Sequence, residues 1–207
     1  MIKVHHLENS RSQRVLWLLE ELDIAYEVVR YARDRKTMLA PPELARVHPL
    51  GKSPVIEDGA QVIAETGAIV EYLVDKADGR LGPPSSRDGV LRYRHFLHYA
   101  EGSMMPPLLA LLVVNRLGLL GKPARKPLLA MFARHLDWLE SELSSRDWFA
   151  GDEFTAADIM MSFPLEAARQ RAGLDGSRPN LIDWLERIHA RPAYAEALKR
   201  GGPYAYA

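Results

Sequence analysis

The first part of the chain constrains the fold most, because two kinds of hydrophobic pattern alternate there within a short distance. Residues Ile2 to Leu7 form a short apolar run that ends in a polar turn, and Tyr26 to Tyr31 form a second run. Between them, apolar residues recur at helical spacing at Val15, Leu18, Leu19 and Leu22. A strand, a helix and a strand in about thirty residues predict a βαβ unit, whose two strands are parallel.

The segments that follow extend this unit into a small α/β domain. A polar loop leads to a short helical pattern at Pro42 to Val47. Two apolar runs, Ser53 to Glu57 and Gln61 to Ala64, flank an Asp58-Gly59 turn, which is a strong signal for a β-hairpin. Residues Glu65 to Lys76 then return to the helical period. The predicted order of elements is therefore βαβαββα.

Residues 79–88 form the clearest linker, because glycine, proline and serine are concentrated there. Every pattern after this segment is helical, and one apolar stripe runs through Leu128, Phe132, Leu136, Leu139 and Leu143. The sequence therefore predicts an α/β domain at residues 1–78 and an all-helical domain at residues 89–207.

The helical region contains one specific helix-start signal. Thr155 and Asp158 have the spacing of a capping box, and Phe154 and Ile159 have the spacing of a hydrophobic staple. Both pairs fix the start of a helix, so we assign Thr155 and Asp158 structural roles.

The composition argues against several classes of function. The 27 Lys and Arg residues balance 27 Asp and Glu, which argues against nucleic acid or an anionic membrane as partner. The chain has no cysteine, which excludes thiolate metal sites and a cysteine nucleophile, and we expect no metal. No signal peptide is apparent, and the most apolar run, Leu108 to Val114, is far shorter than the ~20 residues that span a bilayer. We therefore expect a cytoplasmic protein.

The first candidate functional residues lie where the first strand meets the first helix. Ser10 and Ser12 stand at this junction. Free backbone N–H groups and the helix dipole favour an anion there, and a serine hydroxyl can donate a hydrogen bond to it. Capping of the helix is the structural alternative for both serines.

A second group of candidates surrounds the predicted hairpin. Pro54 stands directly before Val55, where a proline removes a ladder donor. A cis peptide bond that presents the neighbouring backbone to a peptide ligand is one explanation, and an ordinary turn is the other. Lys52 is either a cation for a carboxylate or a solvated lysine. Glu65 and Thr66 either bind a ligand at the next helix start or cap that helix.

These segments carry more weight together than singly. The alternation of strands and helices places them at the same end of the predicted sheet, where they offer a hydroxyl donor, a backbone edge, a cation and an acid. That set of groups suits a small zwitterionic peptide.

The chain resembles the soluble glutathione transferases over essentially its whole length. The stretch SRSQRVLWLLEE, Ser10 to Glu21, is similar to the serine-type bacterial and fungal branch, and PLGKSPV, Pro49 to Val55, is similar to the glutathione-site segment with its cis proline. Glu65-Thr66 stands where the family usually has an acid followed by serine, and the threonine keeps the hydroxyl. Residues 154–158 match the second domain's capping motif. The resemblance implies a thioredoxin-like N-terminal domain followed by an all-helical C-terminal domain, in a homodimer.

The resemblance also implies a role for each matching residue. Ser10 would donate a hydrogen bond to the glutathione thiolate, with Ser12 and Asn9 as rivals. Lys52 would meet the glycyl carboxylate, with His48 nearby. The remaining contacts would be a cysteinyl contact to the Val55 backbone, a γ-glutamyl contact to Glu65 and Thr66, and a loop held by Pro54.

The implied activity is conjugation of glutathione, as co-substrate, to hydrophobic electrophiles. A glutathione-dependent peroxidase and a non-catalytic ligand-binding or stress-response protein are the alternatives. The electrophile would meet the helical domain, and the candidates on its first helix are Tyr99, Met104, Met105 and Leu108. Burial in the core or in a subunit interface is the alternative for these four residues.

Overall fold

A computed structural model describes residues 1–207 and divides them into two compact units. The first unit contains residues 1–82 and 189–205 together with residue 207, and the second contains residues 83–188 and residue 206. The first expected domain, residues 1–78, lies within the first unit. The C-terminal segment differs from the expected division, because we expected it in the helical domain.

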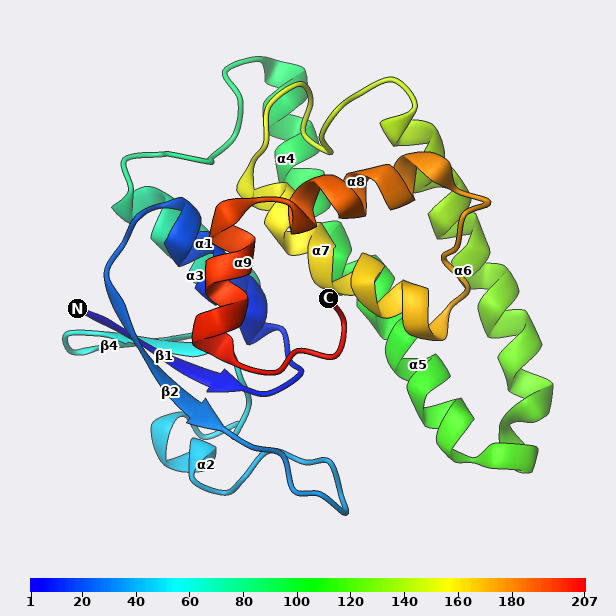
Figure 1. The fold of residues 1–207 in the computed structure, drawn as a ribbon, viewed down its shortest axis with the longest axis horizontal. Coiled ribbons are helices and arrows are strands. Elements are labelled where there is room, and N and C mark those ends of the chain that lie inside the picture. Colours follow the sequence, from blue (N-terminus) through cyan, green and yellow to red (C-terminus); the bar gives the residue numbers. More distant parts are fainter. The chain divides into compact units, whose positions relative to one another are not determined.

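A four-stranded sheet forms the centre of the first unit (Figure 1). Its strands are β1 (Ile2–Leu7), β2 (Tyr26–Tyr31), β3 (Val55–Asp58) and β4 (Gln61–Ala64), in the order β2-β1-β3-β4. The β1 and β2 strands are parallel, which confirms the βαβ prediction, and the other two pairings are antiparallel.

The three helices of the N-terminal segment complete the predicted βαβαββα order. They are α1 (Ser12–Glu21), α2 (Leu44–Val47) and α3 (Thr66–Lys76). The β3 strand begins later than predicted, at Val55 rather than Ser53, because Pro54 has no N–H to donate to the ladder. The Ser53–Pro54 peptide bond is cis, as expected.

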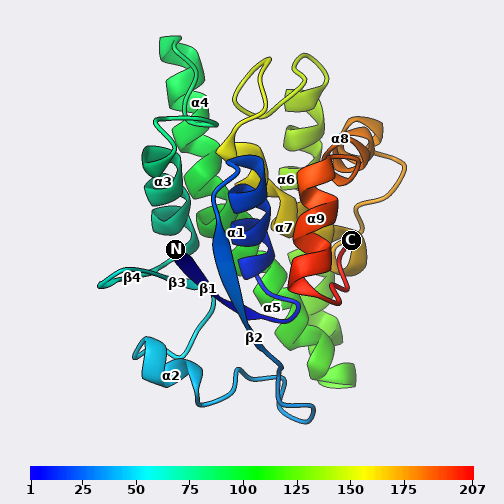
Figure 2. The same cartoon turned by 60° about the vertical axis from the view of Figure 1, so that its left-hand side comes forward.

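The predicted apolar face of α1 is the inner face of the first unit. Val15, Leu18, Leu19 and Leu22 are all buried. The α1 helix packs against β1 and α3 on this face. Helix α2 lies away from α1 and α3 in both views (Figures 1 and 2).

The last helix of the chain, α9 (Pro192–Gly201), packs against α1 and touches β2. Figure 2 shows α1 and α9 side by side. Arg191 donates two hydrogen bonds to the Glu21 carboxylate, at 2.5 and 2.8 Å. Arg200 pairs with Glu20 at 3.0 Å. These two pairs join α9 to α1, and the apolar pattern alone did not reveal them.

The second unit is entirely helical. Its main helices are α4 (Arg87–Tyr99), α5 (Met105–Arg116), α6 (Lys122–Leu143), α7 (Ala156–Arg171) and α8 (Pro179–His189). A π-helical turn at Ala100–Met104 joins α4 to α5, and a 3₁₀ turn at Gly118–Gly121 joins α5 to α6. The α7 helix packs against both α4 and α5, and it is buried along most of its length.

The continuous helical stretch from Arg87 to Arg116 contains a window with a mean hydropathy of 1.2, which meets a length and composition test for a membrane-spanning helix. One such helix is weak evidence for a span, because the core helix of a globular protein meets the same test. In this unit the stretch packs against α6 and α7.

The predicted capping box at the start of α7 is present. Asp158 Oδ2 accepts hydrogen bonds from the Thr155 backbone N–H at 3.0 Å and from the Thr155 hydroxyl at 3.2 Å. Its other oxygen accepts from the Phe149 N–H at 3.0 Å and from the Trp184 indole at 3.3 Å. Asp158 therefore ties three segments of the helical unit together, beyond the helix start that the sequence predicts.

Candidate active site

The strand registers bring three segments to one end of the sheet. His5 of β1 lies opposite Val55 of β3, and Val55 lies opposite Ala64 of β4. The carboxyl end of β1, the start of β3 and the end of β4 are therefore neighbours. The turn that contains Ser10, the loop that contains Pro54 and the Glu65 helix start follow from these three strand ends, which confirms the shared edge predicted from the sequence.

Ser10 and Ser12 form a short hydrogen-bonded pair at the start of α1. Their hydroxyl oxygens lie 2.7 Å apart, and the Ser12 backbone N–H donates to Ser10 Oγ at 3.2 Å. Ser10 is 5% exposed and Ser12 is 0% exposed. Ser10 is therefore the more exposed of the two residues, and its hydroxyl also bonds a free backbone N–H as a capping residue does.

The start of α1 carries no acidic residue in its first turn. Arg11 and Arg14 are the charged residues beside it. The positive end of the helix dipole favours a negative charge at this position. This local field suits an anion.

Asn9, one rival for the ligand contact, already serves another segment. Its backbone adopts a positive φ of 50°, and its side-chain oxygen accepts a hydrogen bond from the Ala205 N–H at 2.7 Å. The amide of Asn9 thus fixes the C-terminal segment of the first unit.

The loop before β3 is anchored by a residue that the sequence analysis did not single out. The Ser53 hydroxyl donates to the His5 carbonyl at 2.8 Å and accepts from the Leu7 N–H at 3.2 Å. These bonds join the cis Ser53–Pro54 segment to β1, so Val55 starts its strand from a fixed position. A serine directly before a proline was the only sequence signal for this role.

Glu65 has an unusual backbone conformation and does not act as a side-chain cap. Its φ is +72°, in a region that non-glycine residues rarely adopt, and its side chain makes no capping hydrogen bond. Backbone conformations of this kind are concentrated at ligand sites. Thr66, which begins α3, is buried beside it.

The two candidates for a ligand carboxylate lie at or near the surface of the first unit. Lys52 is exposed, and His48 is partly exposed and accepts a hydrogen bond from the Leu50 N–H at 3.4 Å through Nδ1. The ammonium group of Lys52 is therefore available to a ligand that reaches this loop.

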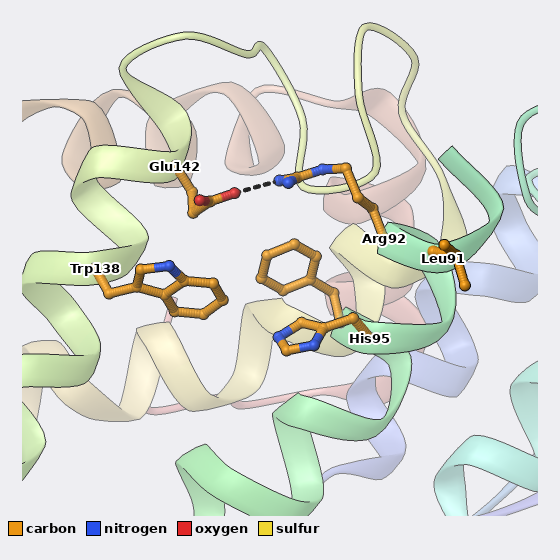
Figure 3. A pocket seen from close by; sticks show the side chains of 6 residues that line it. Leu91, Arg92, His95, Trp138 and Glu142 are labelled. Carbon is orange, nitrogen blue, oxygen red and sulfur yellow. Dashed lines mark hydrogen bonds and ion pairs between the residues drawn. The ribbon is translucent and has the colours of Figure 1, made fainter. Parts of the chain in front are cut away.

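The helical unit holds a cavity of about 270 Å³ between α4 and α6 (Figure 3). Arg92 reaches from α4 to the Glu142 carboxylate of α6, at 2.5 Å. His95 and Trp138 meet edge to face, with ring centroids 5.5 Å apart. This cavity contains none of the residues expected to meet an electrophile.

Of those four residues, three are core residues of the helical unit. Met104, Met105 and Leu108 are buried. Tyr99 is partly exposed, lines a second cavity of about 410 Å³ and shares a hydrogen bond of 2.5 Å with His135. The burial of the first three favours the core alternative, because a fully packed side chain offers little surface to a ligand. A contact between the electrophile and these residues stays a prediction.

The fold and this edge of the sheet define a class of protein: a βαβαββα domain with a hydroxyl, a cis proline and an acid at adjacent strand ends, joined to a helical unit. The glutathione S-transferase N-terminal domain model matches residues 1–75, and the C-terminal domain model matches residues 115–187. The chain belongs to the glutathione S-transferase family.

Individual relatives agree with this assignment. "Glutathione S-transferase 3" of Schizosaccharomyces pombe is 35% identical over 93% of this chain and 85% of its own. A crystal structure of a glutathione S-transferase from Actinobacillus pleuropneumoniae is 34% identical, with a TM-score of 0.89 over 100% of this chain and 95% of its own. A family member from Pseudomonas fluorescens, solved with two glutathione molecules bound, is 25% identical over 95% of this chain and 92% of its own, with a TM-score of 0.81.

Proposed function

We propose that this protein conjugates the thiolate of glutathione to hydrophobic electrophiles, as a serine-type member of its family. The observation that carries the proposal is the Ser10 hydroxyl, which lies at the start of α1 beside the two other strand ends of the site. The attacking group is the thiolate of the co-substrate, since the chain has no cysteine.

The Ser10 hydroxyl and the start of α1 can together supply the free energy needed to ionise the glutathione thiol. A free thiol has a pKa of about 8.5, and lowering it by about two units needs about 2.7 kcal/mol in favour of the thiolate. A hydrogen bond to a charged group contributes roughly 1.5–3 kcal/mol, and a helix N-terminus adds roughly 0.3–1 kcal/mol. One hydroxyl and one helix start therefore supply the stabilisation, and Ser10 itself need not ionise.

The other site residues have roles toward the rest of the glutathione molecule. Lys52, with His48 nearby, binds the glycyl carboxylate. The Val55 backbone pairs with the cysteinyl unit. Glu65 and Thr66 hold the γ-glutamyl end. The exposure of Lys52 and the positive φ of Glu65 support these assignments.

The proposal also covers the second substrate, the oligomeric state and the location of the protein. The electrophile binds beside the helical unit, the protein acts as a homodimer, and it serves detoxification in the cytoplasm. These points are consistent with membership of the glutathione S-transferase family.

Retention on immobilised glutathione, followed by assays with an aryl halide, an enone and an organic hydroperoxide, tests the activity. We expect retention and turnover of at least one carbon electrophile. Turnover of the hydroperoxide alone would indicate a glutathione peroxidase, and retention with no turnover would indicate a binding protein. A chain that is not retained would refute glutathione binding.

The role of Ser10 is tested by the ultraviolet absorbance of bound thiolate as a function of pH. The Ser10→Ala variant should form thiolate only at a pH about one to two units higher, because the charged hydrogen bond is lost. Ser86→Ala is the matched control, since Ser86 caps α4 by accepting from the Gly89 N–H at 3.0 Å. A titration that Ser10→Ala leaves unchanged would contradict the assignment.

A further inference from the structure

A buried histidine that the proposed reaction does not use lies directly behind the two serines. His6 is on β1, and its Nδ1 lies 2.9 Å from Ser12 Oγ. Ser12 Oγ in turn lies 2.7 Å from Ser10 Oγ. His6 and Ser12 are both buried. A continuous line of hydrogen bonds therefore runs from His6 in the interior of the first unit to the Ser10 hydroxyl, which is the proposed donor to the thiolate.

The side of the imidazole away from Ser12 faces the last helix. His6 forms a hydrogen bond with the Gly201 backbone of α9, and this bond raises its pKa. A backbone bond has that effect when the imidazole donates to a carbonyl. Because Nδ1 is the nitrogen next to Ser12, a ring that donates to Gly201 does so through Nε2, and when neutral it has Nδ1 as an acceptor.

The His6 ring stays neutral over the pH range in which the glutathione thiol ionises. Burial, aided by the positive charge of Arg30 on β2, lowers the pKa of His6 to about 4. The groups that face the ring from α1 and α9, the Ser12 hydroxyl and the Gly201 backbone, carry no charge. The acceptor at Nδ1 is therefore present at every pH at which glutathione would be ionised.

Each serine has only one hydroxyl hydrogen, so the direction of the chain follows. Ser12 gives its hydrogen to His6 Nδ1 at 2.9 Å, since the other acceptor within reach, the Leu7 carbonyl, lies at 3.4 Å. Ser12 can then only accept in its bond with Ser10. The hydrogen in the 2.7 Å contact between the two hydroxyl groups consequently belongs to Ser10.

We propose that His6 and Ser12 are positioning residues that point the hydroxyl hydrogens toward the interior. Ser10 alone can then donate to the thiolate, and to do so its hydroxyl must give up its hydrogen bond to Ser12. This inference rests on the proposed function and deepens it. It excludes Ser12 as a donor to sulfur, because the hydrogen of Ser12 is held by His6. Ser12 also competes with the ligand for the hydrogen of Ser10.

Because of this competition, Ser12→Ala should lower the pKa of the bound thiol, whereas loss of a donor would raise it. Removing the competing acceptor leaves the hydrogen of Ser10 to the sulfur, so the pH at which bound thiolate appears should fall by roughly half to one unit. The variant keeps the backbone N–H that holds Ser10 Oγ. In a Ser10→Ala background the same substitution should produce no fall. If this pH rose or did not change in the Ser12→Ala variant, the proposal would be overturned. A rise is expected if the hydroxyl hydrogens point toward the ligand, or if Ser12 itself donates to the sulfur, because the substitution would then weaken thiolate stabilisation.

The tautomer can be measured on the unliganded wild-type protein. Imidazole ¹⁵N spectra, with the His6 signals assigned by their loss in a His6→Gln variant, should show an unprotonated Nδ1 and a protonated Nε2 at pH 7. A protonated Nδ1 would overturn the proposal. This measurement needs no glutathione, so failure of the wild-type protein to bind glutathione would refute the proposed function and still leave the direction of the chain decided.

Discussion

At the residue scale, Asp158 is a fully buried polar side chain that joins three segments of the helical unit. Its two oxygens accept four hydrogen bonds, from Phe149, Thr155 and Trp184, and no cation lies among these partners. Its substitution would leave buried donors without acceptors, and each such loss costs about 1–3 kcal/mol.

The Asp158→Ala variant should lose about 3 kcal/mol or more in its free energy of unfolding, measured by urea denaturation. Asp137→Ala is a suitable control, because Asp137 is an exposed partner of Arg178 on the same unit. Equal losses in the two variants would contradict the central role of Asp158.

Asp158 also predicts a pH dependence of stability. Burial raises its pKa to about 6, against the four hydrogen bonds, which lower it. Between about pH 4 and pH 6 the folded state then binds a proton that the unfolded state has released, so the free energy of unfolding attributable to Asp158 falls as the pH rises through this interval. Urea unfolding of wild type and Asp158→Asn at several pH values isolates this dependence. A difference between the two proteins that does not vary between pH 4 and pH 7 would show that the pKa is not raised.

Substitution of Glu65 should affect glutathione binding without affecting the stability of the fold. Its carboxylate makes no capping bond and it is exposed, so Glu65→Gln should leave the free energy of unfolding within about 0.5 kcal/mol of wild type. Loss of a charged hydrogen bond to the γ-glutamyl end should raise the Kd for glutathione about tenfold or more. Isothermal titration calorimetry measures this change, with Glu71→Gln, on the same helix, as control. An unchanged Kd would remove Glu65 from the proposed site.

At the scale of elements, the docking of α9 on α1 completes the first unit. Arg191 binds Glu21 through two hydrogen bonds, and the Trp17 indole donates to the same carboxylate at 2.8 Å. The helices also approach closely at Gly201, where an added Cβ would lie 2.6 Å from the Gln13 side chain and 3.0 Å from that of Leu16. The contact is therefore both ionic and tightly packed.

A double-mutant cycle on Glu21→Gln and Arg191→Gln should give a coupling energy of about 1 kcal/mol, above the median for exposed pairs, because the carboxylate is largely shielded from solvent. Lys199 and Glu196, an exposed pair on α9 at 2.9 Å, form the matched control cycle and should couple by only a few tenths of a kcal/mol. Equal coupling in the two cycles would show that the Arg191 pair does not hold the helix.

At the scale of the whole molecule, the chain leaves the first unit after Gly82 and returns to it at His189. The N-terminal segment therefore does not contain all of its own unit. A fragment of residues 1–82 should show weak or no cooperative unfolding in circular dichroism, whereas the same fragment joined by a flexible linker to residues 189–205 should unfold cooperatively. If both fragments had the same stability, α9 would not be part of the folding unit.

The sequence by itself determined the local architecture of this protein. The apolar period and the turn signals gave the order of strands and helices, the parallel first pair and the linker region, because these depend on neighbouring residues. The capping box at Thr155 and Asp158 was predictable for the same reason. Motif order also placed Ser10, Pro54 and Glu65 together, since alternating strand directions bring those chain ends to one edge.

Only the tertiary structure decided which contacts join residues that are distant in sequence. The packing of α9 on α1 involves two arginines that lie 170 and 180 positions from their glutamates, and no periodicity encodes such a pairing. The burial of Met104, Met105 and Leu108 was likewise decided by packing, because the apolar face of a helix has the same sequence pattern whether it lies in a core or lines a pocket. The hydrogen-bonded line from His6 through Ser12 to Ser10 also depends on tertiary structure, because it joins the first strand to the turn before α1.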